Sequence, residues 1–168
     1  MSLSMYQASV PVFVRALTNL HHVLKLGEKH AKDKGVDDAT MLQVRLIPDM
    51  LPLVKQVQIA TDMAKNGTAR LAGVDPLKFD DNETSFAELY ARLDRAIDYI
   101  KSFKPEQIDG SETRAIVLKT RNGELNFEGQ AYLLHYVLPN MFFHCTTAYD
   151  ILRVAGTHIG KQDFIGKP

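Results

Sequence analysis

The chain has 168 residues, which is enough for about one domain with a core that needs no disulfide or metal ion. A hydrophobic fraction of 45% and a charged fraction of 24% exclude a disordered chain. Twenty basic residues balance twenty acidic ones, which argues against a general nucleic-acid-binding protein. The single cysteine, Cys145, excludes an intramolecular disulfide framework.

Apolar residues at steps of three and four near the N-terminus predict a long amphipathic helix that ends at Gly35. Its apolar stripe comprises Val10, Phe13, Val14, Leu17, Leu20 and Leu24. Pro11 leaves two alternatives for the start of this helix. Either the helix begins near Ser9 with Pro11 in its first turn, or it begins earlier and kinks at Pro11.

A short helical piece is expected from Asp37 to Leu42, and a second long helix from about Asp49 to Ala72. Many residues of its inner stripe are small, which predicts close packing against a neighbouring helix. This stripe comprises Leu53, Val54, Val57, Ala60, Ala64, Thr68 and Leu71. The aperiodic segment 74–83 predicts a loop. When extended, a loop of this length can cross a helix bundle, so the next helix need not run antiparallel.

The third long helix begins with a capping box, in which the Ser85 hydroxyl and the Glu88 carboxylate satisfy free amide groups of the first turn. Its apolar stripe comprises Phe86, Leu89, Leu93, Ala96, Ile97, Ile100 and Phe103. Pro105 disfavours helical geometry in the residue before it, so the helix is expected to stop there.

The apolar period changes to two between Ile116 and Phe127, which predicts a β-hairpin. Asn122 and Gly123 are expected to form a type I′ turn, because both residues accept positive φ. The register that follows pairs Arg121 with Glu124, Thr120 with Leu125, and Leu118 with Phe127. Four apolar side chains then share one face, which must lie on the helices because an isolated hairpin is marginally stable. These are Ile116, Leu118, Leu125 and Phe127.

A last helix is expected from Gly129 to Val154. Four long helices with inward-facing stripes predict an all-α fold, a four-helix bundle with the small β-hairpin between its third and fourth helices. No internal repeat, low-complexity tract or linker interrupts the chain. Residues 1–168 are therefore expected to form a single domain.

The last helix carries residues that invite a chemical interpretation. His135 and His144 fall on opposite faces of a straight helix, so they are not expected to bind one metal ion together. Asn140 and His144 are one turn apart and share a face. Spacing alone favours a buried His144 that is hydrogen-bonded to a polar partner over a metal ligand.

The second long helix carries polar residues at Gln56, Gln58, Asp62 and Lys65. Such residues usually form a solvated face, and Asp62 and Lys65 have the spacing of a weak ion pair. Cys145, in a helix interior, is interpreted as a small apolar filler rather than a nucleophile. The sequence contains no glycine-rich phosphate loop, nucleophile elbow or His-Glu-x-x-His motif.

The beginning of the sequence lacks the basic and apolar regions of a secretion signal. No stretch approaches about 18 uninterrupted apolar residues, the length that a membrane-spanning helix needs. We therefore expect a cytoplasmic protein that binds neither membranes nor nucleic acid.

Four runs of the sequence resemble known bundle proteins. Residues 132–153, YLLHYVLPNMFFHCTTAYDILR, look like the closing helix of the DinB/YfiT-like superfamily. Three further runs resemble one branch of it, the domain-of-unknown-function family numbered nineteen-ninety-three. They are residues 4–13 (SMYQASVPVF), 48–62 (PDMLPLVKQVQIATD) and 160–164 (GKQDF). The resemblance spans nearly the whole chain and implies a DinB/YfiT-like bundle of up-down-down-up topology that frequently forms homodimers.

Members of the wider superfamily are often described as metalloenzymes with three histidines, one on the second helix and two, four residues apart, on the fourth. Some are thiol-dependent transferases or isomerases. Carried over here, the fourth-helix positions fall on Asn140 and His144, and the second-helix position falls on Gln58, allowing a shift of one residue. Amides are poor ligands for zinc or nickel. We therefore expect no stoichiometric metal and no other cofactor, with His144 as the one weak metal candidate.

Two functional hypotheses follow. In the first, a small-molecule pocket uses His144 as the general acid or base of a transferase, isomerase or hydrolase, and Asn140 orients it or polarises a substrate carbonyl. That pocket is lined by Gln58, Asp62, Asn140 and His144. In the second, the protein is a non-enzymatic homodimeric structural or interaction module, and the same residues form a satisfied polar core. Truncating a core partner costs about 1–3 kcal/mol, whereas a binding site often loses little stability.

Overall fold

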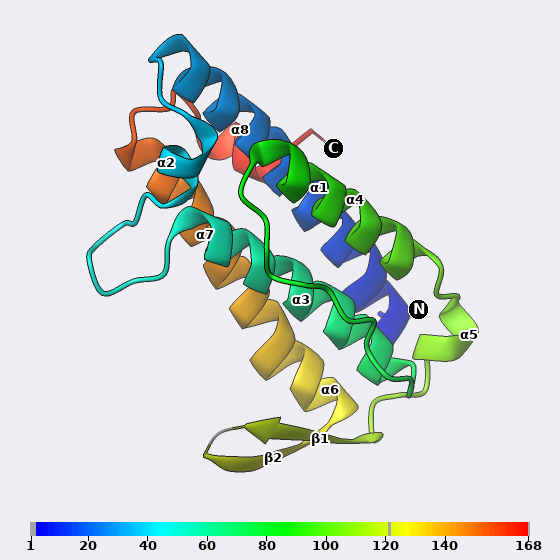
Figure 1. Cartoon of the computed structure of the whole chain (residues 1–168). Helices are drawn as coiled ribbons and strands as arrows, with labels where there is room; N and C mark the ends of the chain where they lie inside the picture. The colour runs from blue at the N-terminus through cyan, green and yellow to red at the C-terminus, as the bar shows by residue number, and fades with distance from the viewer. Residues whose placement is uncertain (1–2, 121, 168) are drawn as a thin grey trace.

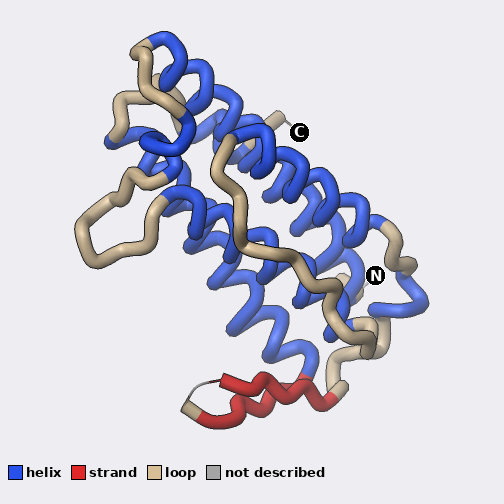
Figure 2. Tube along the Cα trace, in the orientation of Figure 1, coloured by secondary structure: helices blue, strands red, loops and turns tan. Residues whose placement is uncertain are grey.

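The computed structural model describes residues 3–120 and 122–167. The chain is mostly helical and carries one small two-stranded antiparallel hairpin (Figure 1). Long helical segments lie side by side, and the hairpin sits at one end of them (Figure 2). Within the described ranges, no helix is long and apolar enough to cross a membrane.

Helix α1 spans Met5–Asp33 and starts at a capping box formed by Ser4. Pro11 therefore lies inside the helix, and the earlier of the two predicted starts is the observed one. The proline ring is exposed, so it does not disturb the core. Helix α2 spans Asp38–Leu42, as predicted, and Asp37 is its N-cap.

Helix α3 spans Leu53–Leu71, so the start predicted near Asp49 is too early. Pro52 is the N-cap of α3, and its ring disfavours helical geometry at Leu51, which prevents the helix from extending backwards. The small residues of α3 allow close packing, as predicted. A Cβ atom added at Gly67 would lie 2.8 Å from a methyl group of Val137.

Helix α4 spans Phe86–Lys101 and begins with the predicted capping box of Ser85 and Glu88. The short helix α5, Pro105–Ile108, follows it. The segment 74–83 has no regular structure and runs along the length of the helices before α4 begins (Figure 2). The helices α3 and α4 can therefore point in the same direction.

Strands β1, Ala115–Thr120, and β2, Gly123–Glu128, form the predicted hairpin in a different register. The opposite pairs include Ile116 with Phe127, Leu118 with Leu125, and Thr120 with Gly123. The predicted pairs Thr120–Leu125 and Leu118–Phe127 are therefore wrong. The predicted pair of Arg121 with Glu124 lies outside the described residues.

The register differs because Asn122 and Gly123 do not form a type I′ turn. Such a turn would place Asn122 and Gly123 between the strands, whereas Gly123 already pairs with Thr120 as the first residue of β2. The Thr120 hydroxyl instead donates to the Gly123 carbonyl at 2.8 Å and accepts from the Asn122 amide at 3.2 Å. The predicted apolar face survives, because its four residues still lie in opposite pairs. Ile116 and Leu118 are buried, Phe127 is half-buried and Leu125 is exposed.

The last helix, predicted from Gly129 to Val154, consists of three segments. They are α6 (Gly129–Ala131), the π-helix η1 (Tyr132–Val137) and α7 (Leu138–Val154). In η1 the turn is wider, and the Leu138 amide donates to the Leu133 carbonyl. Pro139 explains the wider turn, because it has no amide proton for the His135 carbonyl and its ring would crowd that oxygen in an α-helix.

Helix α3 packs against α4 on one side and α7 on the other, and α1 also contacts both α4 and α7. The helices α3 and α4 run in one direction, and α1 and α7 run in the opposite direction (Figure 1). The short helix α8, Lys161–Ile165, folds back onto α1. The buried core follows the predicted stripes, with fully buried residues such as Phe13, Leu17, Leu71 and Leu93.

Candidate functional site

His144 of α7 forms a hydrogen-bonded pair with Gln56 of α3. The Nδ1 atom of His144 lies 2.7 Å from the Oε1 atom of Gln56. The Gln56 amide group is itself held in place, because its Nε2 donates to the Leu51 carbonyl at 2.9 Å. Gln56 is only 1% exposed. The prediction of a solvated face is therefore wrong at Gln56, because α7 covers this side of α3.

This pair determines the tautomer of the imidazole. An amide oxygen only accepts hydrogen bonds, so Nδ1 of His144 carries the proton and Nε2 keeps its lone pair in the neutral form. Burial lowers the pKa of His144, which favours the neutral form at pH 7. The Phe143 ring meets the imidazole edge-on, with 5.2 Å between centroids. This arrangement supplies a neutral base or hydrogen-bond acceptor at Nε2.

Asn140 lies one turn before His144 on the same helix and is half-buried. Its Nδ2 atom donates to the Tyr136 carbonyl at 2.7 Å. In the described part of the chain, no hydrogen bond joins Asn140 to His144. The shared face that the sequence predicts therefore brings these two side chains to neighbouring turns without linking them directly.

Gln58 and Asp62 face a different neighbour from Gln56. Two residues along a helix correspond to about 200° of rotation, so Gln58 points away from the side that contacts α7. Its Nε2 atom donates to Glu83 at 2.6 Å. Asp62 accepts from Nη2 of Arg92 at 3.0 Å. The structure therefore divides the four predicted pocket residues into two separate groups.

Arg92 of α4 is the centre of the second group. Its side chain is 2% exposed, and its guanidinium group lies within 3.1 Å of three carboxylates, those of Asp62, Asp81 and Glu83. Its Nε atom also donates to the Thr61 hydroxyl at 2.8 Å. Sequence reasoning missed this residue. The available signal was an arginine on an apolar stripe, three residues after Leu89 and four before Ala96.

Lys65 extends the same charged network. Its Nζ atom lies 3.4 Å from Asp62, which confirms the predicted ion pair, and it donates to Asn66 Oδ1 at 2.7 Å. Burial lowers the pKa of Lys65, and the Asp62 carboxylate opposes this effect. Among the described residues, Gln58 Oε1 is a buried acceptor with no hydrogen-bond partner. Gln58 and Lys65 are both 2% exposed. The prediction of a solvated face is therefore wrong at these two residues as well.

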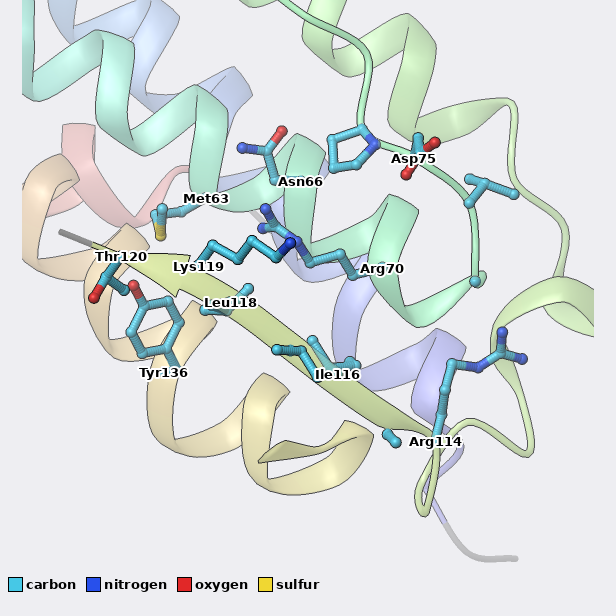
Figure 3. A pocket seen from close by; sticks show the side chains of 15 residues that line it. Met63, Asn66, Arg70, Asp75, Arg114, Ile116, Leu118, Lys119, Thr120 and Tyr136 are labelled. Carbon is cyan, nitrogen blue, oxygen red and sulfur yellow. The ribbon is translucent and has the colours of Figure 1, made fainter. Parts of the chain in front are cut away.

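A third location is a cleft of about 680 Å³ at the C-terminal end of α3 (Figure 3). It lies between α3, strand β1, the start of the 74–83 loop and Tyr136 of η1. Its charged lining residues are Arg70, Asp75, Arg114 and Lys119. Sequence reasoning missed this cleft, because its residues come from segments far apart in the chain and form no local motif.

Arg70 is held in this cleft by a buried tyrosine. Its Nη1 atom donates to the Tyr132 hydroxyl oxygen at 3.0 Å. The Tyr132 ring stacks on Tyr136 with 5.8 Å between centroids and also contacts Phe127. Burial raises the pKa of Tyr132, so its hydroxyl stays neutral. The guanidinium group is thus positioned by an uncharged partner.

A family model described as Domain of unknown function (DUF1993) matches residues 5–165. The chain belongs to this family. A crystal structure of a DinB family member protein from Shewanella denitrificans is similar to this DUF1993 protein, with a TM-score of 0.88 and 35% sequence identity. The match covers 97% of this chain and 92% of that chain, and it confirms the DinB-like resemblance. Among curated proteins, none matches.

The donor groups of this DUF1993 protein do not fit the metal of the three-histidine superfamily. In residues 3–120 and 122–167, no group of three or more His, Cys, Asp or Glu side chains could hold a metal ion. His135 is exposed, and the Gln56 oxygen is occupied by His144. Burial raises the pKa of the Cys145 thiol to about 12, so it stays protonated. Neutral amides and a thiol bind zinc or nickel weakly.

Proposed function

We propose that this DUF1993 protein is an up-down-down-up four-helix bundle that binds a small molecule at His144 without a metal ion. The hydrogen bond between Gln56 and His144 carries the proposal, because it holds a half-buried imidazole in one tautomer. No described residue forms a hydrogen bond with Nε2 of His144. That atom is therefore left to accept a hydrogen bond or a proton from a ligand.

In an enzymatic version, Nε2 of neutral His144 accepts a proton from a hydroxyl or amine of the substrate. The Gln56 oxygen accepts a hydrogen bond from Nδ1 in both charge states, so it keeps the ring oriented throughout. Asn140 is the neighbouring polar side chain and would bind a substrate carbonyl. Gln58 and Asp62 contact Arg92 and Glu83, so we assign them to the support of α3 rather than to ligand contact. This chemistry suits a transferase, isomerase or hydrolase.

A second candidate function is a homodimeric interaction module. Two aromatic side chains of α7, Phe142 and Phe143, are 38% and 55% exposed. Apolar side chains grouped at a surface suit a protein partner. In this version the hydrogen bonds of His144 and Asn140 belong to a satisfied polar core.

A metabolite-library thermal-shift screen of the purified protein separates the two candidates. His144→Ala is compared with His135→Ala, which removes an exposed imidazole from the same last helix. The pocket proposal expects a compound that stabilises the wild-type protein and His135→Ala but not His144→Ala. If no compound discriminates and both His144→Ala and Asn140→Ala lose about 1–3 kcal/mol, the polar-core version is correct.

Elemental analysis tests the absence of a metal. The protein is purified under mild conditions without chelators or an affinity tag, and we expect no stoichiometric transition metal. About one equivalent of zinc, nickel or iron per chain, lost in His144→Ala, would restore the metalloenzyme interpretation.

A further inference from the structure

We propose that the cleft at the C-terminal end of α3 binds a small organic anion, whose carboxylate or phosphate group contacts Arg70, Lys119 and Asn66. The cleft has a volume of about 680 Å³, within the range of natural small-molecule sites. It is a different location from His144, and the proposal does not rest on the proposed function.

The charges that line this cleft are unbalanced. Arg70, Arg114 and Lys119 contribute three cations, and Asp75 contributes one carboxylate. Across the residues that the structure describes, no carboxylate lies within 4.0 Å of any of these three cations. Five other basic side chains have carboxylate partners, namely Lys29, Lys32, Lys55, Lys65 and Arg92, and others such as Lys78 and Lys161 have none among the described residues. The feature that distinguishes the cleft is that three cations without a carboxylate partner line one concavity. A bound anion would supply the missing countercharge.

Arg70 is positioned but not saturated. Its link to the Tyr132 hydroxyl uses one of the five N–H donors of a guanidinium group. Because Tyr132 is buried and stacked on Tyr136, the guanidinium group is ordered before any ligand arrives. Its other donors form the planar fork that recognises carboxylate and phosphate oxygens.

Lys119 and Asn66 complete the set of donors. The Lys119 and Arg70 side chains converge in the cleft (Figure 3). Two cations that converge repel each other, and an anion between them relieves the repulsion. The Asn66 Oδ1 atom accepts from Lys65, so the orientation of its amide is fixed and the N–H donors of Nδ2 are left for a ligand.

The remaining walls indicate an apolar or aromatic body for the ligand. Met63, Leu118 and Tyr136 line the cleft beside the donors. Arg114 receives a lesser role, since its guanidinium group lies against Gly73 just beyond the end of α3. The C-terminal end of α3 carries partial negative charge, which already stabilises the Arg114 guanidinium group.

Isothermal titration calorimetry of the full chain at low ionic strength tests the proposal with four probes. They are phenyl phosphate, phenylacetate, inorganic phosphate and benzyl alcohol. We expect saturable binding of an aromatic anion and none of benzyl alcohol. The tighter of phenyl phosphate and phenylacetate identifies the phosphate or the carboxylate as the preferred group. No saturable binding of any anion up to about 10 mM, or equal binding of benzyl alcohol, would overturn the proposal.

Matched variants locate the site. Lys119→Met should weaken binding of the aromatic anion about tenfold, which corresponds to the loss of one charge-assisted hydrogen bond. Lys101→Met removes the same charge from an exposed residue of α4 and should change the affinity less than about twofold. Asp75→Asn removes a negative charge from the cleft and should tighten binding about two- to threefold. Equal losses of affinity in Lys119→Met and Lys101→Met would show that the anion does not bind in this cleft.

Arg70→Met should weaken binding at least as much as Lys119→Met, because it removes the fork. Its fold is checked by circular dichroism, since Tyr132 loses its partner in this variant. Lys119 is exposed, so Lys119→Met keeps the test decisive even if Arg70→Met does not fold.

Discussion

The two sides of α3 use arginine in opposite ways. On the α4 side, Arg92 is buried and its guanidinium group is shared among three carboxylates and the Thr61 hydroxyl. On the hairpin side, Arg70 is held by the Tyr132 hydroxyl and faces a cleft with few acidic groups. An arginine whose donors are used within the chain stabilises the fold, whereas an arginine that is positioned but unsaturated is available to a ligand.

The largest expected effect comes from Arg92→Met, because it leaves neighbouring carboxylates without their partner. We expect a loss of about 3 kcal/mol in the free energy of unfolding, the lower end for a broken buried pair. The lower end applies because Asp62 and Asp81 are 31% and 47% exposed and can regain water. Urea unfolding measures the loss. The exposed Arg95→Met is the control, and equal stability of the two variants would remove the contrast between the two sides.

The next effect concerns the glycine on which Arg114 rests. Gly73 has φ of +74°, and a Cβ atom there would collide with the Arg114 guanidinium group. Gly35 has a similar φ of +68° but nothing within 4 Å, so Gly35→Ala measures backbone strain alone, about 1–2 kcal/mol. We expect Gly73→Ala to cost about the same in urea unfolding, because the exposed Arg114 side chain is flexible and its guanidinium group can move away. A clearly larger loss in Gly73→Ala that disappears in the Arg114→Met background would contradict this expectation and show that Arg114 is held in place.

A smaller effect is expected from Tyr132→Phe, which removes the hydroxyl that holds Arg70. The loss of this hydrogen bond should cost about 1 kcal/mol in urea unfolding. Affinity for the aromatic anion should also fall, because Arg70 is no longer ordered before binding. Tyr99→Phe on α4 is the control. Unchanged affinity in Tyr132→Phe would mean that the tyrosine only stabilises the fold.

The smallest effect is a pH dependence that belongs to His144. Burial lowers the pKa of His144 in the folded state, so the unfolded chain binds more protons as the pH falls below the ordinary histidine value of about 6.5. The contribution of His144 to the free energy of unfolding should therefore be complete above that value and be lost as the pH falls through the folded-state pKa. Burial lowers the pKa of His21 as well, so it adds to the same trend.

Urea unfolding at about pH 7.5 and at about pH 5.5 measures this loss. The free energy of unfolding of His144→Gln should fall less between the two pH values than that of the wild-type protein. The matched variant His135→Gln changes an exposed residue and should keep the slope of the wild-type protein. The same slope in both variants would assign the pH dependence to other groups.

Local signals in the sequence determine much of the fold. The capping box at Ser85 and Glu88 lies where predicted, because a cap depends on residues within one turn, and the short helix predicted from Asp37 is found at Asp38–Leu42. The hairpin register was not predictable from Asn122 and Gly123, since the Thr120 hydroxyl competes for the groups of the turn. The identity of two turn residues favours a turn type but does not determine it alone.

The candidate sites depend on contacts between distant segments, and the sequence shows less of them. The resemblance points to Asn140, His144 and Gln58, and in the structure His144 is hydrogen-bonded to Gln56 of α3 rather than to Gln58. A shift of two residues changes the side of the helix, and only packing against α7 decides it. Arg70 and Lys119 are 49 positions apart in the sequence, and no periodicity connects them.

The π-helical turn of η1 has a consequence for comparisons between relatives. A π-turn holds an extra residue compared with an α-turn, so η1 behaves as an insertion that the helix has already absorbed. A relative that lacks this residue would have its earlier positions rotated by about 100°. Its counterpart of Tyr132 would then no longer meet Arg70. An alignment that treats the last helix as uniform would misassign the first residues of this helix, Tyr132 included, and with them the hydroxyl that holds Arg70.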